Sequence, residues 1–216
     1  MEDGHKRKKI KLVVFDVDGT LVFGNLWRLL HELAGTLNKA AILYAYHKAR
    51  ALTQLEYLDA DASLWKGQPM EKVLEIARAM PIIDGAKETA DALRAAGIQL
   101  AIVSAGIDVL VNIVAKEMGI TIVRTNVLLT DVDNNLTGEV SRKVLFDKDW
   151  HVREIVKDLG ITLEETCFVG DGRNDINAMD ICGLSISING ELDVDEAAMF
   201  IVKTNDLRDI LKYIVY

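Results

Sequence analysis

Two aspartates follow directly after a short apolar run near the start of the chain. Residues 12–15 read Leu-Val-Val-Phe, and Asp16 and Asp18 come next, with one valine between them. Side chains alternate along a strand, so residues two apart project to the same side. Ligands of open α/β sheets bind beyond the carboxyl ends of the strands, where carboxylates can meet a metal ion or a substrate. The pair indicates a reaction centre; the alternative is a polar turn at Asp18-Gly19.

A hydroxyl and a lysine occur at later points of the same pattern. Ser104 comes directly after the apolar run Gln99–Val103 and precedes the small residues Ala105 and Gly106. Such a turn ahead of a helix offers an anion a hydroxyl and backbone N–H groups. Lys148 opens a predicted helix further along the chain. Both residues are therefore candidates for binding an anionic substrate.

A second acidic segment, Gly170-Asp171-Gly172-Arg173-Asn174-Asp175, follows another apolar run. The carboxyl ends of parallel strands meet at one edge of a sheet, so we expect these acids to converge with Asp16 and Asp18. Carboxylate oxygens without a nearby histidine or thiolate are typical of a magnesium site that water and a substrate phosphate complete. We therefore expect Mg²⁺ as the cofactor.

The elements that position these residues follow from the pattern of apolar residues. After Pro81, short apolar strands alternate with helices, which predicts an α/β fold: a Rossmann-like three-layer core with a mostly parallel sheet. The predicted elements are strand 12–15, helix 86–96, strand 99–103, helix 108–118, strand 121–124, a hairpin over 128–140, helix 149–159, strand 166–169, helix 175–181, strand 184–188 and a final helix from Leu207.

Residues 22–80 are instead predicted to be helical, because apolar residues recur there at helical spacing. The residues of these stripes, which we expect to face a core, are Leu26, Leu29, Leu30, Leu33, Leu37, Met70, Val73, Leu74 and Ala77. A small helical domain is thus predicted between the first aspartates and Ser104.

Composition excludes several classes of protein. With 216 residues, 50% of them hydrophobic, and a net charge of −8, the chain is expected to fold and to repel nucleic acid. The basic run His5–Lys9 is expected to be a solvated tail. Cys167 and Cys182 are too few for a disulfide framework, which fits a reducing cytoplasm. No signal segment is evident, and two glycines interrupt the apolar stretch Ala95–Ala115, so we expect no membrane span.

Two rival motifs fail. Ser104 lacks the glycine two positions earlier that the turn of a serine hydrolase requires, since Ile102 stands there. Asp131-Val132-Asp133-Asn134-Asn135 is similar to a calcium loop, but its sixth position is Leu136 and its twelfth is Arg142, where glycine and glutamate are needed. A hairpin turn explains that segment better.

Taken together, the motifs resemble those of the haloacid dehalogenase-like phosphatase superfamily, most closely its phosphoserine phosphatase-like branch. Asp16-Val17-Asp18-Gly19-Thr20 is similar to the first motif, Ser104-Ala105-Gly106 to the second, Lys148 to the third and residues 170–175 to the fourth. Lys148 lies 23 residues before Asp171, the spacing of that branch, so we prefer it to Lys143. Four motifs in order, each on its predicted element, make the resemblance specific.

The resemblance implies a role for each residue. Asp16 is expected to attack phosphorus and form an aspartyl-phosphate, and Asp18 to act as the general acid and base. Mg²⁺ is expected between the Asp16 carboxylate, the Asp18 main-chain carbonyl and Asp171. The residues expected to bind the phosphoryl group are Ser104, Ala105, Lys148 and Asn174, and those expected to support the site are Gly19, Thr20 and Asp175, the last by orienting Lys148 or metal-bound water.

The resemblance also implies that residues 22–80 form a cap that selects the leaving group, on a core made of residues 1–21 and 81–216. Where the branch has a glutamate and an arginine for recognising phosphoserine, this chain has Asn25 and Asp61. We therefore expect weak or no phosphoserine activity. Other candidates for specificity are Trp27 and Arg28; a cap charge or aromatic surface could also come from Lys48, Arg50, Lys66, Tyr44, Tyr46 or Trp65.

The expected function is Mg²⁺-dependent hydrolysis of a small-metabolite phosphomonoester by a cytoplasmic monomer or homodimer. Two alternatives stay open at this point. One is phosphoryl transfer to a sugar or alcohol, and the other is a non-catalytic module that binds phosphate. Loss of a motif acid would favour the second alternative, and none is lost.

Overall fold

The structure is a computed structural model that describes residues 9–141, 144 and 148–215. Two sequence predictions concern residues outside these ranges. The basic run His5–Lys9 is described only at Lys9, and Lys143 lies outside the described residues.

A seven-stranded sheet forms the centre of the molecule. Its strands are β1 (Leu12–Phe15), β2 (Gln99–Ile107), β3 (Ile122–Thr130), β4 (Leu136–Ser141), β5 (Thr166–Gly170), β6 (Leu184–Ile188) and β7 (Phe200–Val202). They lie in the order β4-β3-β2-β1-β5-β6-β7, and neighbours are parallel except β3 and β4. All residues of β1 are buried, because both of its faces are apolar and covered. The predicted α/β fold is confirmed.

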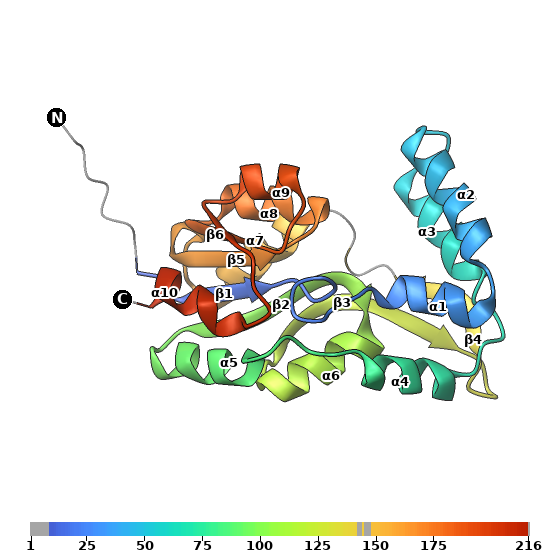
Figure 1. Ribbon diagram of the computed structural model, residues 1–216, viewed down its shortest axis with the longest axis horizontal. Helices are drawn as coiled ribbons and strands as arrows, with labels where there is room; N and C mark the ends of the chain where they lie inside the picture. The colour runs from blue at the N-terminus through green and yellow to red at the C-terminus, as the bar shows by residue number, and fades with distance from the viewer. Residues whose placement is uncertain (1–8, 142–143, 145–147, 216) are drawn as a thin grey trace.

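Helices cover both faces of this sheet (Figure 1). Their bounds are α5 (Ala86–Ala95), α6 (Asp108–Met118), α7 (Lys148–Leu159), α8 (Ile176–Ile181), α9 (Leu192–Ala197) and α10 (Leu211–Ile214). Residues of α7, α8 and α9 form a core with Leu12 and Val14 on one face of β1. Residues of α5, α6 and α10 pack on the other face, with Val13 and Phe15. The alternation of side chains along β1 thus separates two hydrophobic cores.

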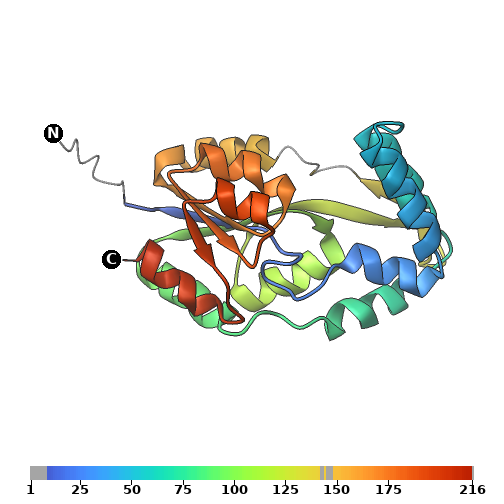
Figure 2. The ribbon, with the colours of Figure 1, turned by 45° about the horizontal axis from the view of Figure 1, so that its top comes forward.

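Residues 22–80 contribute four helices, α1 (Leu26–Ala34), α2 (Leu37–Lys48), α3 (Gln54–Ser63) and α4 (Met70–Ala79). Helices α1 and α4 contact each other, and α4 contacts α6 of the sheet layer. Helices α2 and α3 form a pair that projects beyond the sheet, which Figure 2 shows from a second direction. The helical prediction for this segment is correct, and the segment has an attached part and a projecting part.

One predicted core stripe is interrupted. Helix α1 ends at Gly35, which has a left-handed φ of 66°, so Leu37 starts a new helix and is 41% exposed. Glycine adopts this conformation without a Cβ clash and commonly ends helices. The prediction that Leu37 faces a core with Leu26 and Leu30 was therefore wrong, whereas Leu26 and Leu30 are buried.

The β3–β4 hairpin, predicted over residues 128–140, holds the loop between α3 and α4. Gly67 N donates to Leu136 O at 2.8 Å, and Leu136 N donates to Gln68 O at 2.8 Å. Met70 N donates to Asn134 O at 3.0 Å in the hairpin turn. These backbone bonds attach one end of α4 to the sheet.

Two elements were not predicted, α9 and β7. They contain six and three residues, too few for a hydrophobic period to stand out. The final helix, predicted from Leu207, begins as a 3₁₀ turn over Leu207–Ile210 before α10. Neither difference affects the carboxyl ends of β1, β2 and β5.

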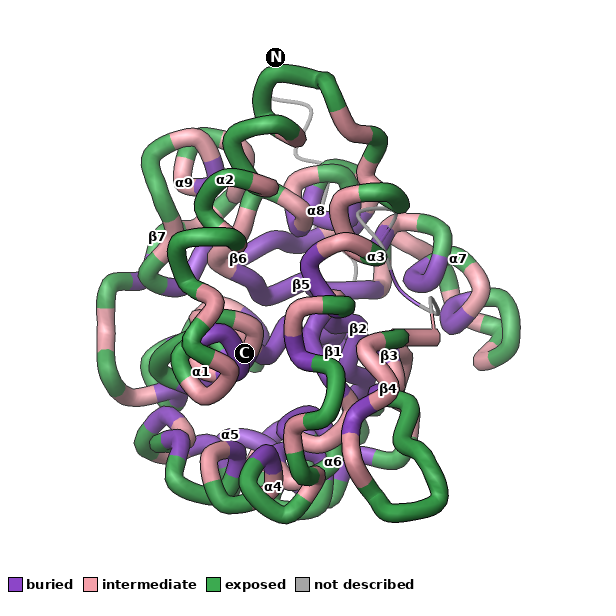
Figure 3. Tube along the Cα trace, turned by 90° about the vertical axis from the view of Figure 1, so that its right-hand side faces the viewer, coloured by how far each residue is buried: buried purple, intermediate pink, exposed green. Residues whose placement is uncertain are grey.

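Buried residues concentrate in the central strands, which appear purple in Figure 3. Helix α2 contains no buried residue. Over the described ranges, none of the helices is both long enough and apolar enough to cross a membrane.

Candidate active site

Asp16 follows the last residue of β1 and is held at the carboxyl edge of the sheet. Its backbone N–H donates to Val169 O of β5 at 3.0 Å, and the residue is 5% exposed. The Lys148 ammonium lies 2.9 Å from Asp16 Oδ1 and is fully buried at the start of α7. A buried carboxylate needs such a cation, because an unpaired charge in the interior is costly.

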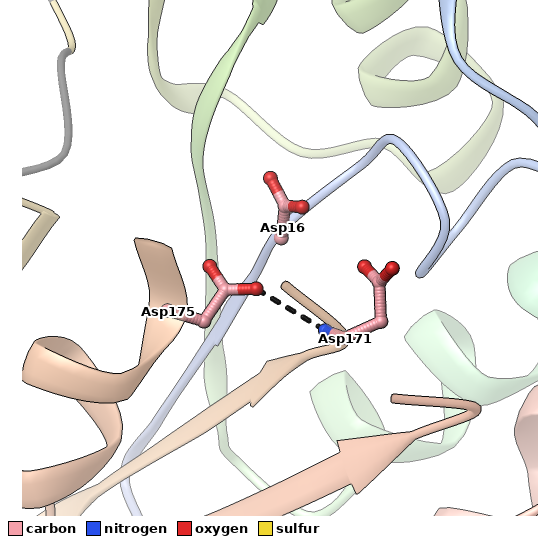
Figure 4. A group of neighbouring side chains, drawn as sticks. All are labelled: Asp16, Asp171 and Asp175. Atoms are coloured by element: carbon pink, nitrogen blue, oxygen red, sulfur yellow. Dashed lines mark hydrogen bonds between the residues drawn. The ribbon is translucent and has the colours of Figure 1, made fainter. Parts of the chain in front are cut away.

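Lys148 also contacts Asp175, as predicted. Its Nζ donates to Asp175 Oδ1 at 2.5 Å, and Asp175 Oδ2 accepts from the backbone N–H groups of Asp171 at 3.1 Å and Gly172 at 2.9 Å. Figure 4 shows the first of these backbone bonds as a dashed line. Burial raises the pKa of Asp175, and Lys148 opposes that rise. Asp175 therefore fixes both Lys148 and the loop that carries Asp171.

Carboxylate oxygens of Asp16, Asp171 and Asp175 lie within 4.8 Å of one another (Figure 4). Asp171 Oδ1 accepts a hydrogen bond from Thr20 Oγ1 at 2.7 Å. Burial, followed by the charge of Asp16, raises the pKa of Asp171 to about 7. Hard oxygen donors that repel one another in this way fit a divalent cation such as Mg²⁺.

Gly19 makes room for this group of carboxylates. Its φ is 85°, and a Cβ built on it would lie 2.1 Å from Asp171 Oδ2. Only glycine allows the first loop to approach Asp171 this closely. Gly19 and Thr20, both predicted to support the site, thus contact or adjoin the Asp171 side chain.

The Asp18 carboxylate turns away from that group toward the start of α1. Its Oδ1 accepts from Leu26 N at 2.9 Å, and its Oδ2 is buried with no hydrogen-bond partner among the described residues. Burial raises the pKa of Asp18 to about 7, with a further contribution from the charge of Asp16. Metal binding by Asp18 therefore depends on its main-chain carbonyl. Its side chain, with a raised pKa, is suited to donating a proton.

Ser104 and Ala105 lie where β2 changes register against β3, between Val103 and Ile107. Ser104 is buried, and its Oγ accepts from Gly106 N at 3.1 Å. Asn126 of β3, which the sequence did not single out, donates from Nδ2 to Ala105 O at 3.0 Å. The residues of this irregularity line the same cavity as Asp16 and Asp18, and bulges are common next to active sites.

A cavity of about 370 Å³ lies between the carboxyl edge of the sheet and helices α1, α2 and α3. It is lined by Asp16, Asp18, Asn25, Trp27, Tyr44, Tyr57, Leu58, Asp61, Ser104, Ala105, Gly106, Asp171, Gly172 and Asn174. Lys148 and Asp175 lie beneath this lining, and Arg28 pairs with Glu32 on the exposed side of α1. The structure thus brings together nearly every predicted site residue.

Two residues of α3 that line the cavity, Tyr57 and Leu58, were not among the residues predicted from the sequence. Tyr57 stands four residues before Asp61 on α3, so helical spacing from Asp61 could have indicated it. Asn25, a specificity candidate, is the N-cap of α1 and accepts from Arg28 N at 3.1 Å. Of the other aromatic candidates, Trp65 is fully buried and Tyr46 is 54% exposed outside the cavity lining.

Comparison with known proteins agrees with this geometry. The model of the haloacid dehalogenase-like hydrolase family matches residues 13–180. A phosphoserine phosphatase of Methanocaldococcus jannaschii is 34% identical over 209 residues, covering 96% of this chain and 99% of that protein. One of Campylobacter jejuni subsp. doylei is 30% identical, covering 95% of this chain and 100% of the relative.

Solved structures give the same result. A phospho-aspartyl intermediate analogue of phosphoserine phosphatase has a TM-score of 0.84 and 33% identity, covering 96% of this chain and 100% of that chain. A substrate-bound phosphoserine phosphatase complex has a TM-score of 0.84 and 33% identity, covering 96% and 99%. The predicted class, a hydrolase of phosphomonoesters, is confirmed. The chain belongs to the haloacid dehalogenase-like hydrolase family, in its phosphoserine phosphatase-like branch.

Proposed function

We propose that the protein is an Mg²⁺-dependent phosphatase that hydrolyses a small phosphomonoester through an aspartyl-phosphate on Asp16. The observation that carries the proposal is the Asp16 carboxylate at the end of β1, which lines the cavity, is paired with Lys148 and lies beside Asp171. An ionised carboxylate held in one orientation is a competent nucleophile toward phosphorus. Relatives named as phosphoserine phosphatases support the reaction class.

Asp18 is the proposed general acid and base. Because Leu26 N–H already donates to Oδ1, the transferable proton belongs on Oδ2, which has no partner in the described structure. A pKa of about 7 keeps a protonated fraction at neutral pH, so Oδ2 can protonate the leaving oxygen. The same oxygen can then accept a proton from the water that hydrolyses the intermediate.

Ser104, Asn174 and Lys148 are the proposed phosphoryl ligands. Ser104 Oγ accepts from Gly106 N–H, which leaves its own O–H free to donate to a phosphoryl oxygen. Lys148 uses two of its three N–H donors on Asp16 and Asp175, so one remains for the phosphoryl group. Such donors stabilise the charge that moves onto these oxygens in the transition state.

Asp16, Asp171 and the Asp18 main-chain carbonyl are the proposed Mg²⁺ ligands, with Asp175 in the same group of carboxylates. When bound, the metal neutralises the repulsion between the acids and the phosphate. Thr20 keeps Asp171 oriented through its 2.7 Å hydrogen bond. The close approach at Gly19 keeps the first loop against the same carboxylate.

The proposed cap is residues 22–80, on a core of residues 1–21 and 81–216. The cavity supports this division, because its catalytic lining comes from strand ends and its remaining lining from α1, α2 and α3. The proposed location is the cytoplasm, in keeping with two buried free cysteines, Cys167 and Cys182. A monomer or homodimer is the proposed assembly.

Hydrolysis of p-nitrophenyl phosphate with Mg²⁺ tests the function. We expect Asp16→Asn to lower kcat by about 10⁴-fold or more, because the nucleophile is lost. Glu71→Gln, which removes an exposed carboxylate of α4 outside the cavity, is the matched control and should leave kcat unchanged. Full activity of Asp16→Asn contradicts the proposal.

A second measurement separates catalysis from phosphate binding. Beryllium fluoride with Mg²⁺ mimics an aspartyl-phosphate and should raise the melting temperature of the wild type but not that of Asp16→Asn. Product analysis with an added alcohol should show inorganic phosphate rather than a phosphorylated alcohol. Binding of the mimic without any turnover would indicate a regulatory module instead.

A further inference from the structure

Asp61 lines the cavity from α3 and is unusual among the cap residues there. It is 3% exposed, and its Oδ2 lies 3.1 Å from His31 Nε2. Its Oδ1 is buried and has no hydrogen-bond partner within the described residues. A buried carboxylate oxygen without a partner is costly, so a site that retains one is prepared for a donor that arrives with the ligand.

The orientation of Asp61 is fixed from behind. Trp65 Nε1 donates to His31 Nδ1 at 3.0 Å, and indole N–H can only donate. His31 Nδ1 therefore accepts, its proton is on Nε2, and that N–H donates to Asp61 Oδ2. Trp65 is fully buried, and its ring lies 5.1 Å from that of His31, so this chain of hydrogen bonds is rigid.

Apart from Asn25 and Leu58, the rest of the cap lining is aromatic, and it carries no positive charge. Trp27, Tyr44 and Tyr57 line the cavity beside Asp61, and none of the described lining residues is a lysine or arginine. Tyr57 and Asp61 lie one turn apart on α3, and burial, followed by the charge of Asp61, raises the pKa of Tyr57. Aromatic faces and one carboxylate together attract an organic cation.

We infer that the leaving group of the substrate carries an ammonium group, primary or methylated, that binds Asp61 and the aromatic rings of the cap. This inference rests on the proposed phosphatase function and names its substrate class, the phosphomonoesters of small amino alcohols. A carboxylate on the leaving group would meet Asp61 without a compensating cation, so carboxylated substrates are disfavoured. A cavity of about 370 Å³ is near the lower end for ligand sites, which fits a small alcohol.

A panel of matched phosphomonoesters tests this inference. The two ammonium substrates are O-phosphoethanolamine and phosphocholine; O-phosphoserine adds a carboxylate to the first, and glycerol phosphate replaces the cation with hydroxyls. We expect kcat/KM to be at least about 10-fold higher for an ammonium substrate than for O-phosphoserine or glycerol phosphate, since a charge-assisted contact contributes that much. Preference for glycerol phosphate or O-phosphoserine overturns the inference.

The variant Asp61→Asn keeps the shape of the side chain and an oxygen for His31. We expect it to lower kcat/KM for the ammonium substrates by about 10- to 100-fold, mainly through KM, and to lower it by a smaller factor for p-nitrophenyl phosphate, which carries no ammonium group. Glu71→Gln should leave both activities unchanged. An Asp61→Asn enzyme that retains the ammonium preference overturns the inference.

The p-nitrophenyl phosphate assay also distinguishes failure of the inference about Asp61 from failure of the proposed phosphatase function. If the wild type hydrolyses p-nitrophenyl phosphate through Asp16 but does not favour ammonium substrates, only the inference about Asp61 fails. If the wild type hydrolyses none of the esters, the phosphatase proposal fails as well. A melting temperature equal to that of the wild type shows that Asp61→Asn is folded.

Discussion

The cavity has two walls that are stabilised differently. The sheet supplies one wall, and the helices supply the other. On the sheet side, Asp16, Lys148 and Asp175 form a buried network in which the ammonium joins two carboxylates. On the helix side, Asp61 contacts one histidine and keeps an oxygen without a partner in the described structure. Both walls keep one carboxylate oxygen without a partner in the described structure, Asp18 Oδ2 and Asp61 Oδ1, but only the sheet wall holds a carboxylate in an ion pair with a buried ammonium before substrate arrives.

This difference shows how reaction and selectivity are separated in one cavity. The groups we assign to catalysis come from the ends of β1, β2 and β5, strands that pack on both cores, and from the start of α7, which packs on one of them. The groups we assign to selectivity come from α1, α2 and α3, and α2 has no buried residue. A rigid wall can fix reacting atoms, whereas an exposed helix such as α2 can change without disturbing them.

The largest effect is expected from removing the Lys148 ammonium, which joins two carboxylates in the sheet wall. Lys148→Met leaves Asp16 and Asp175 buried without their cation, so we expect kcat to fall by about 10³-fold or more. The free energy of unfolding should fall by roughly 3–5 kcal/mol. Urea denaturation and steady-state kinetics with p-nitrophenyl phosphate measure the two effects.

A double variant sharpens this prediction. Lys148→Met with Asp175→Asn removes one of the two carboxylates left unpaired, so it should recover part of the lost stability while kcat stays low. If the two substitutions are additive in stability, the ammonium does not join the two carboxylates as described.

A smaller effect is expected where the first loop approaches Asp171. Gly19→Ala places a Cβ against Asp171 Oδ2, so we expect weaker Mg²⁺ activation and a kcat/KM lower by about 10- to 100-fold. Gly35→Ala is the matched control, since its φ of 66° is also left-handed but nothing lies within 4 Å of its Cβ. It should lose only about 1–2 kcal/mol of stability and keep its activity. Equal loss of Mg²⁺ activation in both variants would show that backbone strain, not the contact with Asp171, is responsible.

The smallest effect concerns the stability of the metal-free protein as pH changes. Asp18 and Asp171 have pKa values raised from 3.8 to about 7 in the folded state, so the folded protein binds more protons than the unfolded chain between these values. Stability should therefore fall as pH rises from 4 to 7. In EDTA we expect the melting temperature to drop by at least about 4 °C over this range.

Substitution and metal addition identify the groups responsible. Asp171→Asn should flatten the pH dependence, because one of the carboxyls with a raised pKa is removed, and Mg²⁺ should flatten it by neutralising the acids. Glu71→Gln should not change it. A melting temperature that rises with pH in EDTA would contradict the conclusion that burial in the sheet wall raises the pKa values of these carboxyls.

Much of the sheet wall could be predicted because strand geometry relates sequence to space. Asp16, Ser104 and Asp171 each follow an apolar run, and parallel strands bring such positions to one edge. The family model and the relatives confirm the phosphatase class that these motifs indicated. The partners within the wall were harder to predict: the bond from Thr20 to Asp171 joins residues 151 positions apart.

The helix wall could be predicted only in part. The positions of Asn25 and Asp61 were singled out through a resemblance, but the contacts that decide what Asp61 can bind were not. His31 lies on α1 and Trp65 in the turn after α3, 30 and 34 positions from their partners, and no short-range pattern fixes how these segments pack. Tyr57 lines the cavity because of the way α3 packs, and no sequence motif indicates that packing.

The backbone bonds between the β3–β4 hairpin and the loop before α4 have an evolutionary consequence. They join the loop residues Gly67, Gln68 and Met70 to Asn134 and Leu136 of the hairpin. The sheet therefore determines the position of this end of the helical segment. Mutations in α2, which has no buried residue, can then accumulate with little risk to the reacting groups. Substitutions in α2 and α3 are therefore the most direct route to a change of substrate. The α4 helix and the hairpin keep the rest of the helical segment in place while such substitutions occur.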